Sequence, residues 1–190
     1  MSTRVDLWNA RYADAERGAA AWVLREHAHL LPAQGEALDL ACGLGANALL
    51  LADHGLSVQA WDFSPTAIER LEQEALQRGL SLRGEVRDVV QAPPGPASFD
   101  VIVVSHFLER DLMPHLVAAL RPGGLLFYQT FTTDRVAGAS TPGNPAFLLA
   151  PNELLELCRP LRLLVYREDG PYGDAGQGLR AMAALVGARP

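Results

Sequence analysis

The chain has 190 residues, of which 49% are hydrophobic and 20% are charged; it can therefore bury a sizeable core, and disorder as its dominant state is excluded. The formal net charge of −6 at pH 7 disfavours a dedicated nucleic-acid binder, which needs a basic surface to contact phosphates. All 16 basic residues are arginines, which excludes enzymes that depend on a Schiff-base lysine, a P-loop lysine or a lysine general base.

The first half of the chain alternates between helical and strand patterns. Residues 18–31 have amphipathic spacing and stop at Pro32, which predicts a helix. A second helix is predicted to follow Ser64, which suits the N-cap position, with Pro65 in the first turn and Gly79 after the last. The remaining predictions for this half are strands at 37–41, 56–61 and 80–86 and a helix at 46–54.

The second half continues the alternation and then changes its pattern. Residues 99–104 are a continuous apolar run, typical of a strand buried on both faces. The predictions that follow are a helix at 111–120, a turn at 121–124, strands at 125–131, 161–166 and 179–186, and a helix at 151–158. Because no helix separates the last two strands, they should pair antiparallel at the sheet edge. The expected fold is α/β: a single Rossmann-like, doubly wound, mostly parallel seven-stranded sheet with an antiparallel C-terminal edge hairpin.

A glycine-containing turn between the first strand and its helix has the features of a ligand site. Gly43 and Gly45 allow a ligand to approach the backbone, and the following helix offers free N–H groups. Asp62 ends the next strand, where its carboxylate can accept two hydrogen bonds from a ribose diol. Together these residues predict a nucleoside-containing cofactor. Since Gly43-x-Gly45-x-x-Ala48 also fits the dinucleotide pattern, the glycines do not choose between NAD and another adenosine cofactor.

A wider set of segments resembles the class I S-adenosylmethionine-dependent methyltransferases. The matching segments occur in the family's order, at residues 39–45, 62–65, 87–89, 99–104 and 120–124. The opening Trp-Asn-Ala-Arg-Tyr at residues 8–12 and the compact size are most similar to the small tellurite-resistance and thiopurine-methyltransferase type. The resemblance implies S-adenosylmethionine as cofactor, with S-adenosylhomocysteine as product.

The resemblance also assigns roles around the cofactor. Gly43 and Gly45 would lie against its methionine and ribose part, with Asp39 near the ammonium group. Asp62 would hold the ribose hydroxyls, and Phe63 would pack on the adenine.

Further positions follow from the same resemblance. Asp88 would accept a hydrogen bond from the adenine amine while the Val89 amide donates to the ring. Ser105 and His106 would lie by the reacting methyl group, with His106 either a catalytic residue or a packing residue. Arg11 either reaches the methionine carboxylate or forms a surface ion pair.

The expected reaction is in-line methyl transfer to a small-molecule acceptor. The acceptor site would be built from the N-terminal segment and from the loops after the fourth and fifth strands. Its candidate residues form a mixed aromatic and cationic set that suits a small aromatic or anionic acceptor: Trp8, Tyr12, Phe107, Arg110, Phe131 and Arg135. Trp8 and Tyr12 are equally consistent with a clasp that holds the N-terminus down. Should the acceptor need a base, the candidates are His106, Glu109, Asp111 and Tyr128.

These predictions describe one domain over residues 1–190, with an N-terminal lid or helix (1–31), a cofactor-binding core (36–131) and a segment with the substrate loop, a helix and the edge hairpin (132–190). Two other functions stay open: an NAD(P)-binding oxidoreductase and a non-catalytic S-adenosylmethionine-binding protein. No metal-binding motif, membrane segment or nucleic-acid partner is expected, and Cys42 and Cys158 fit a reduced cytoplasm. The oligomeric state is left open.

Overall fold

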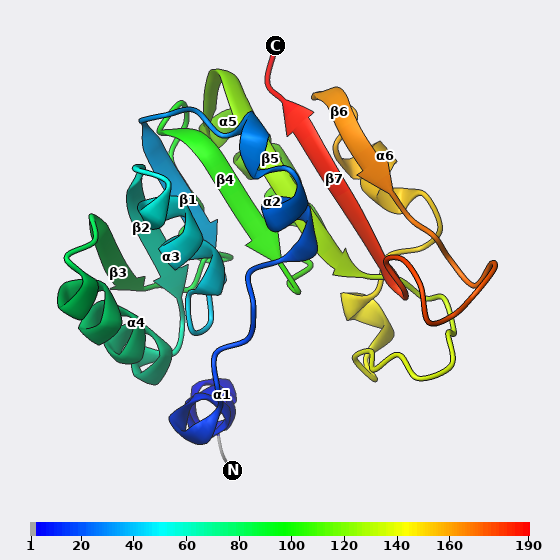
Figure 1. Ribbon diagram of the computed structural model, residues 1–190, viewed down its shortest axis with the longest axis horizontal. Helices are drawn as coiled ribbons and strands as arrows, with labels where there is room; N and C mark the ends of the chain where they lie inside the picture. Colours follow the sequence, from blue (N-terminus) through cyan, green and yellow to red (C-terminus); the bar gives the residue numbers. More distant parts are fainter. Residues whose placement is uncertain (1–2) are drawn as a thin grey trace.

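The computed structural model describes residues 3–190, which form one sheet with helices on both faces (Figure 1). The sheet has seven strands in the order β3-β2-β1-β4-β5-β7-β6. They are β1 (Glu36–Leu40), β2 (Ser57–Asp62), β3 (Leu82–Val86), β4 (Phe99–Ser105), β5 (Leu120–Phe131), β6 (Arg162–Arg167) and β7 (Met182–Ala188). The first five strands pair in parallel, whereas β7 is antiparallel to both β5 and β6. The predicted α/β sheet with an antiparallel C-terminal hairpin is therefore confirmed.

The helices cover the two faces of the sheet. They are α1 (Arg4–Asp14), α2 (Trp22–Glu26), α3 (Ala46–Asp53), α4 (Pro65–Arg78), α5 (Met113–Ala119) and α6 (Glu153–Leu157), with short 3-10 turns at Ala28–Leu30, Arg110–Leu112 and Pro145–Phe147. Leu51 of α3 and Leu71 of α4 belong to the apolar cluster on one face, together with residues of α2. Leu116 of α5 and Leu154 of α6 belong to the cluster on the other. The doubly wound arrangement follows from these two buried layers.

The order of the strands reverses at β1. The chain passes from β1 outward to β3 and then returns to place β4 on the other side of β1, where Asp39 lies opposite Val103. In open parallel sheets, ligands bind beyond the carboxyl ends of the strands at such a reversal. This edge is where the glycine turn begins.

The helix predicted after Ser64 is confirmed as α4. The Ser64 hydroxyl accepts a hydrogen bond from the Ala67 N–H at 3.3 Å, and Pro65 is in the first turn. Gly79 ends the helix in the left-handed conformation, with φ of 64°, which glycine adopts at low cost.

The helix predicted at residues 18–31 is too long. The backbone is extended at Ala21, whose N–H donates to Asn47 Oδ1 at 2.8 Å, and α2 begins only at Trp22. Another side-chain acceptor, Gln129 Oε1, binds the Val23 N–H at 2.9 Å. Contacts with residues far along the chain therefore replaced the first turns of the expected helix.

Two other local features go beyond the predictions. Helix α1 was not predicted, although Thr3 and Asp6 form a capping box: the Asp6 N–H donates to Thr3 Oγ1 at 3.2 Å and the Thr3 N–H to Asp6 Oδ2 at 2.8 Å. The expected turn at 121–124 is an irregularity inside β5: Leu120 pairs with Phe99 and Leu125 with Val101, so the residues between them are skipped in the pairing with β4, and Gly123 has φ of 78°. None of the helices among residues 3–190 is long and apolar enough to cross a membrane.

Candidate cofactor site

The turn between β1 and α3 needs glycine at two positions for different reasons. Gly43 and Gly45 have φ of 52° and 76°, a region that side chains disfavour. A Cβ on Gly45 would overlap the side chain of Leu71 on α4, so this glycine lets α3 pack against α4. A Cβ on Gly43 would instead lie 3.0 Å from the Tyr12 hydroxyl. Gly43 therefore faces the space that Tyr12 covers.

Asp62 joins this turn to the end of β2. Asp62 is only 4% exposed. Oδ2 accepts the Gly43 N–H and Oδ1 accepts the Ser64 N–H, both at 2.9 Å. Burial raises the pKa of Asp62, and these backbone hydrogen bonds partly oppose that shift. Because an ionised carboxylate has about four acceptor positions, the group retains the capacity to accept two hydroxyl donors.

A buried polar network lies behind the turn. Asp39 of β1 accepts the Ala48 N–H at 3.0 Å and, more weakly, Asn47 Nδ2 at 3.4 Å. Asn47 Nδ2 also donates to Ser105 Oγ, at 2.9 Å, at the end of β4. Burial is the main cause that raises the pKa of Asp39 to about 7. The network connects β1, α3 and β4 at the sheet edge.

The sequence predictions did not include Asn47 as a site residue. Its signal was a single polar side chain in the otherwise apolar first turns of α3, where it is 4% exposed. A polar group that is buried in this way needs partners, and Asn47 finds them in Asp39, Ser105 and Ala21.

The residues expected around the adenine follow β2 and β3. The Arg87 N–H donates to the Asp62 carbonyl at 2.8 Å, which keeps the ends of these strands together. Asp88 is exposed and accepts the Val90 N–H at 3.0 Å, whereas Val89 is buried. Phe63 lies against Trp8, with ring centroids 6.4 Å apart. Their contacts with a cofactor stay a prediction.

Helix α1 lies over this edge of the sheet. Trp8 and Tyr12 stack with centroids 5.4 Å apart, and Arg11 lies 4.8 Å from the centroid of the Trp8 ring. The Ser64 hydroxyl donates to Asn9 Oδ1 at 2.5 Å. Burial and the charge of Asp62 raise the pKa of Tyr12, so its hydroxyl stays protonated at neutral pH. The structure thus places the expected N-terminal aromatic residues beside the glycine turn.

His106 follows β4 at the same edge. Its φ is 55°, and its N–H donates to the Gln129 carbonyl of β5 at 2.9 Å. The ring lies 5.2 Å from that of Phe131, and desolvation lowers the pKa of His106 below its usual value. A neutral imidazole here is able to accept a proton at neutral pH.

Two candidates for the acceptor site have structural partners instead. The Arg110 guanidinium binds Glu153 at 2.6 and 3.0 Å and the carbonyls of Ala146 and Leu148, both at 3.0 Å. In the structure it holds the loop before α6, and its expected contact with an acceptor stays a prediction. Tyr128 is 1% exposed and donates to the Phe107 carbonyl at 2.8 Å. Burial raises its pKa, so it is not a base at neutral pH.

The remaining acceptor candidates lie on half-buried or exposed positions. Phe107 and Phe131 are half-buried. Arg135 is exposed and belongs, with Asp134 and Thr141, to the lining of a pocket of about 280 Å³ in the loop after β5. The contacts of these residues with an acceptor stay a prediction.

The sequence matches known proteins over the part of the chain that builds this site. Residues 37–124 match the methyltransferase domain family. A protein of Eikenella corrodens named hemagglutinin 1 is 37% identical over 94 residues, which are 46% of this chain and 31% of that protein. The ubiquinone biosynthesis O-methyltransferase of Burkholderia orbicola (strain MC0-3) is 30% identical over 114 residues, 57% of this chain and 48% of the relative. The chain therefore spans less than half the length of these relatives.

Solved structures share the whole fold. TehB from Haemophilus influenzae has a TM-score of 0.76 at 21% identity, with 98% of this chain and 67% of that chain covered. A structure from work on the conversion of a disulfide bond into a thioacetal group during echinomycin biosynthesis has a TM-score of 0.71 at 25% identity, with coverage of 98% and 92%. Residues 37–124 thus match a methyltransferase domain, and the chain shares its fold with TehB and with an S-adenosylmethionine-dependent methyltransferase from Methanosarcina mazei (TM-score 0.68 at 19% identity, with 90% of this chain and 99% of that chain covered), as its sequence indicated.

Proposed function

We propose that this protein transfers the methyl group of S-adenosylmethionine to a small-molecule acceptor. One observation carries the proposal: at the sheet edge where the strand order reverses, the Gly43 N–H donates to Asp62, and Asn47 donates to both Asp39 and Ser105. This is the position at which open α/β sheets bind nucleotides. The ends of β1, β2 and β4 all contribute to it.

The residues present fit the cofactor. Asp62 keeps acceptor capacity for a ribose diol, and the buried carboxylate of Asp39 gains from a cationic partner such as an ammonium group. Gly43 would lie against the methionine part, while Phe63 and Asp88 would contact the adenine. When bound, S-adenosylmethionine supplies a methyl group on a positively charged sulfur, which is already activated for displacement.

The chain's own contribution to the transfer is alignment and the exclusion of water. Holding two reactants in line is worth about 7 to 11 kcal/mol in favourable cases. Helix α1 covers one side of the edge, and the loop after β5 covers another. His106, at the end of β4, would accept the proton of an acceptor hydroxyl or thiol, with Phe107 and Phe131 packing against the acceptor and Arg135 pairing with an anionic group.

Two observations support a small acceptor. The net charge of −6 opposes binding to a polyanion, and one of the similar proteins is named for ubiquinone biosynthesis. The same proposal assigns residues 1–31 to a lid, 36–131 to the cofactor and 132–190 to the acceptor side. Both cysteines are free and buried, which supports a location in the reducing cytoplasm.

Calorimetric titration tests the cofactor. S-adenosylmethionine and S-adenosylhomocysteine should bind in the micromolar range, whereas NAD should give no heat of binding. Tight binding of NAD without a response to either sulfur compound would overturn the proposal in favour of an oxidoreductase.

Transfer of a labelled methyl group tests the acceptor. Hydroxylated aromatic compounds and small thiols should be methylated, and RNA should not. Methylation of RNA that decreases steeply with salt would show that the acceptor class is wrong. Cofactor binding without transfer to any acceptor would favour a non-catalytic binding protein.

A further inference from the structure

Helix α1 is connected to the rest of the molecule by an extended segment and few apolar contacts. Figure 1 shows it beyond the carboxyl ends of the parallel strands, away from the layers that cover the sheet. Leu7 on this helix is 64% exposed. Apart from the packing of Trp8 and Tyr12 beside Phe63, specific polar contacts hold α1 in place.

The most direct of these contacts comes from Arg70 on α4. Its Nη1 donates to the carbonyl of Tyr12, to that of Ala15 at 2.9 Å and to that of Ala13 at 3.4 Å. The last carbonyls of a helix have no partner within the helix and carry partial negative charge. One guanidinium of α4 therefore fixes the end of α1, including the backbone of Tyr12.

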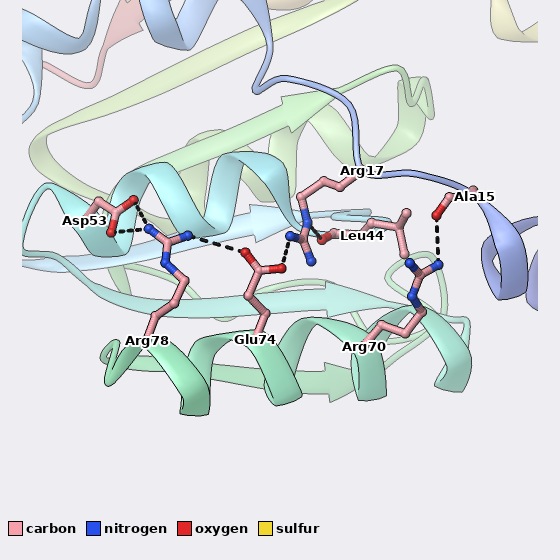
Figure 2. A network of polar contacts seen from close by, with 7 residues as sticks. All are labelled: Ala15, Arg17, Leu44, Asp53, Arg70, Glu74 and Arg78. Atoms are coloured by element: carbon pink, nitrogen blue, oxygen red, sulfur yellow. Dashed lines mark hydrogen bonds and ion pairs between the residues drawn. The ribbon is translucent and has the colours of Figure 1, made fainter.

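A second arginine holds the segment that follows α1. Arg17 Nε donates to the Leu44 carbonyl of the glycine turn at 2.6 Å, and Arg17 Nη1 pairs with Glu74 of α4. Figure 2 shows this arrangement: Glu74 also faces Arg78, which binds Asp53 of α3. The segment is thus connected to both the turn and α4.

These contacts close the edge where the cofactor would bind. The Tyr12 hydroxyl lies over Gly43, and Asp62 is only 4% exposed. The charge of Asp62 acts on the Tyr12 hydroxyl, so Tyr12 lies beside the carboxylate that a ribose would contact, and the backbone of Tyr12 is an acceptor of Arg70. Movement of α1 away from this edge therefore requires the Arg70 contacts with its last carbonyls to break.

We propose that Arg70 and Arg17 are positioning residues that hold α1 closed over the cofactor site and so set the rate at which the cofactor enters. The proposal rests on the proposed function, since it assumes a cofactor at Asp62. When the open state that can bind is populated for only a fraction of the time, the association rate and the affinity both decrease by that fraction. Weakening the contacts of Arg70 raises the open fraction.

Limited proteolysis measures this opening without any cofactor. The chain contains no lysine, so trypsin cleaves only after arginine, and Arg11 and Arg17 report on α1 and its linker. Arg70→Gln should accelerate cleavage at these two positions about tenfold, which is the effect of losing one charge-assisted contact. This expectation applies when opening of α1 is fast relative to cleavage. Arg70→Lys, which keeps the charge and a donor, should lie between this variant and the wild type.

The matched control is Arg78→Gln. Arg78 lies on the same helix and pairs with Asp53 and Glu74, but it has no contact with α1 in the described chain. The rate at which trypsin cleaves the Arg78→Gln variant after Arg11 and Arg17 should equal that of the wild type. Equal cleavage of Arg70→Gln and Arg78→Gln would overturn the proposal, as would acceleration at all arginines together, which reports global unfolding.

Stopped-flow binding of S-adenosylhomocysteine completes the test. The association rate constant of Arg70→Gln should exceed that of the wild type by about the same factor as its cleavage rate. An unchanged or slower association, with cleavage accelerated, would show that α1 opens without controlling entry, which overturns the proposal. If the wild type itself does not bind S-adenosylhomocysteine, the proposed function fails, and with it the role of Arg70 in cofactor entry.

Discussion

Single residues at the sheet edge combine a structural contact with an expected binding contact, and Asp62 shows this most clearly. Both of its oxygens already accept backbone N–H groups, from Gly43 and Ser64. Its carboxylate therefore shapes the turn before any ligand is present. From the sequence alone, Asp62 would be expected to act on the cofactor only, and its removal to leave the free protein as stable as before.

Replacing Asp62 separates these two contributions. Asp62→Ala removes the expected bonds to two ribose hydroxyls, each worth roughly 1.5 to 3 kcal/mol when charge-assisted, and should weaken S-adenosylhomocysteine binding about a hundredfold or more. The melting temperature of the free protein should also decrease, because two buried N–H groups lose their acceptor. Asp62→Asn keeps one acceptor oxygen and should retain more of the stability than of the affinity. Intact affinity per folded molecule in both variants would show that Asp62 has a structural role alone.

Asp39 carries a pH-dependent contribution to stability. Burial raises its pKa from 3.8 to about 7 in the folded protein. Between these values the folded state binds a proton that the unfolded state has released, so the contribution of Asp39 to the free energy of unfolding decreases as pH rises from about 4 to about 7. In the Asp39→Asn variant the side chain at this position does not titrate, so this contribution does not change with pH.

The stability of the variant should accordingly increase relative to the wild type as pH rises across this range, by at most about 1.4 kcal/mol per pH unit. Urea unfolding of both proteins at several pH values measures the difference, in which the contributions of the histidines cancel. A difference that does not depend on pH would show that Asp39 is ionised throughout.

At the scale of elements, arginines attach the parts that cover the sheet edge. Arg70 holds the end of α1, and Arg110 connects the turn before α5 to Glu153 of α6 and to the loop between β5 and α6. These covering parts contain the residues proposed for the acceptor, such as Arg135. The position of the loop between β5 and α6 should therefore matter for transfer more than for cofactor binding, whereas the position of α1 is proposed to control cofactor entry.

Arg110→Gln should release the loop between β5 and α6. We expect faster tryptic cleavage after Arg135 and a clear decrease in methyl transfer, because the loop loses two carbonyl contacts and an ion pair. S-adenosylhomocysteine affinity, measured by calorimetry, should stay unchanged. Arg121→Gln is the control, since it removes a comparable ion pair with Asp100 at the start of β4. Loss of affinity equal to the loss of transfer would place Arg110 at the cofactor instead.

At the scale of the whole molecule, the net charge is negative, and the arginines discussed above form contacts within the protein. Several arginines are engaged in contacts between elements, as Arg17, Arg70 and Arg110 show. They connect α1, the glycine turn and the loop before α6 with other parts of the chain. The sheet, in turn, brings the ends of β1, β2 and β4 to one edge, the position at which open α/β sheets bind ligands.

The sequence by itself determined the alternation of strands and helices, the sheet type and the residues Gly43 and Asp62. These depend on local properties: the run of apolar residues in β4, the capping of α4 by Ser64, and the freedom of glycine at positive φ. Each acts through neighbours in the chain, so its signal can be found in a short window of sequence.

Only the tertiary structure decided how the covering parts are held. The Ala21 N–H meets Asn47, the end of α1 meets Arg70, and Arg110 meets Glu153, and in each pair the residues are far apart in the chain. No short-range pattern predicts such pairs, because each long side chain has many possible acceptors until the sheet brings one of them within reach. The sequence therefore predicted where a cofactor would bind, and the folded chain decided which contacts hold the parts around that position.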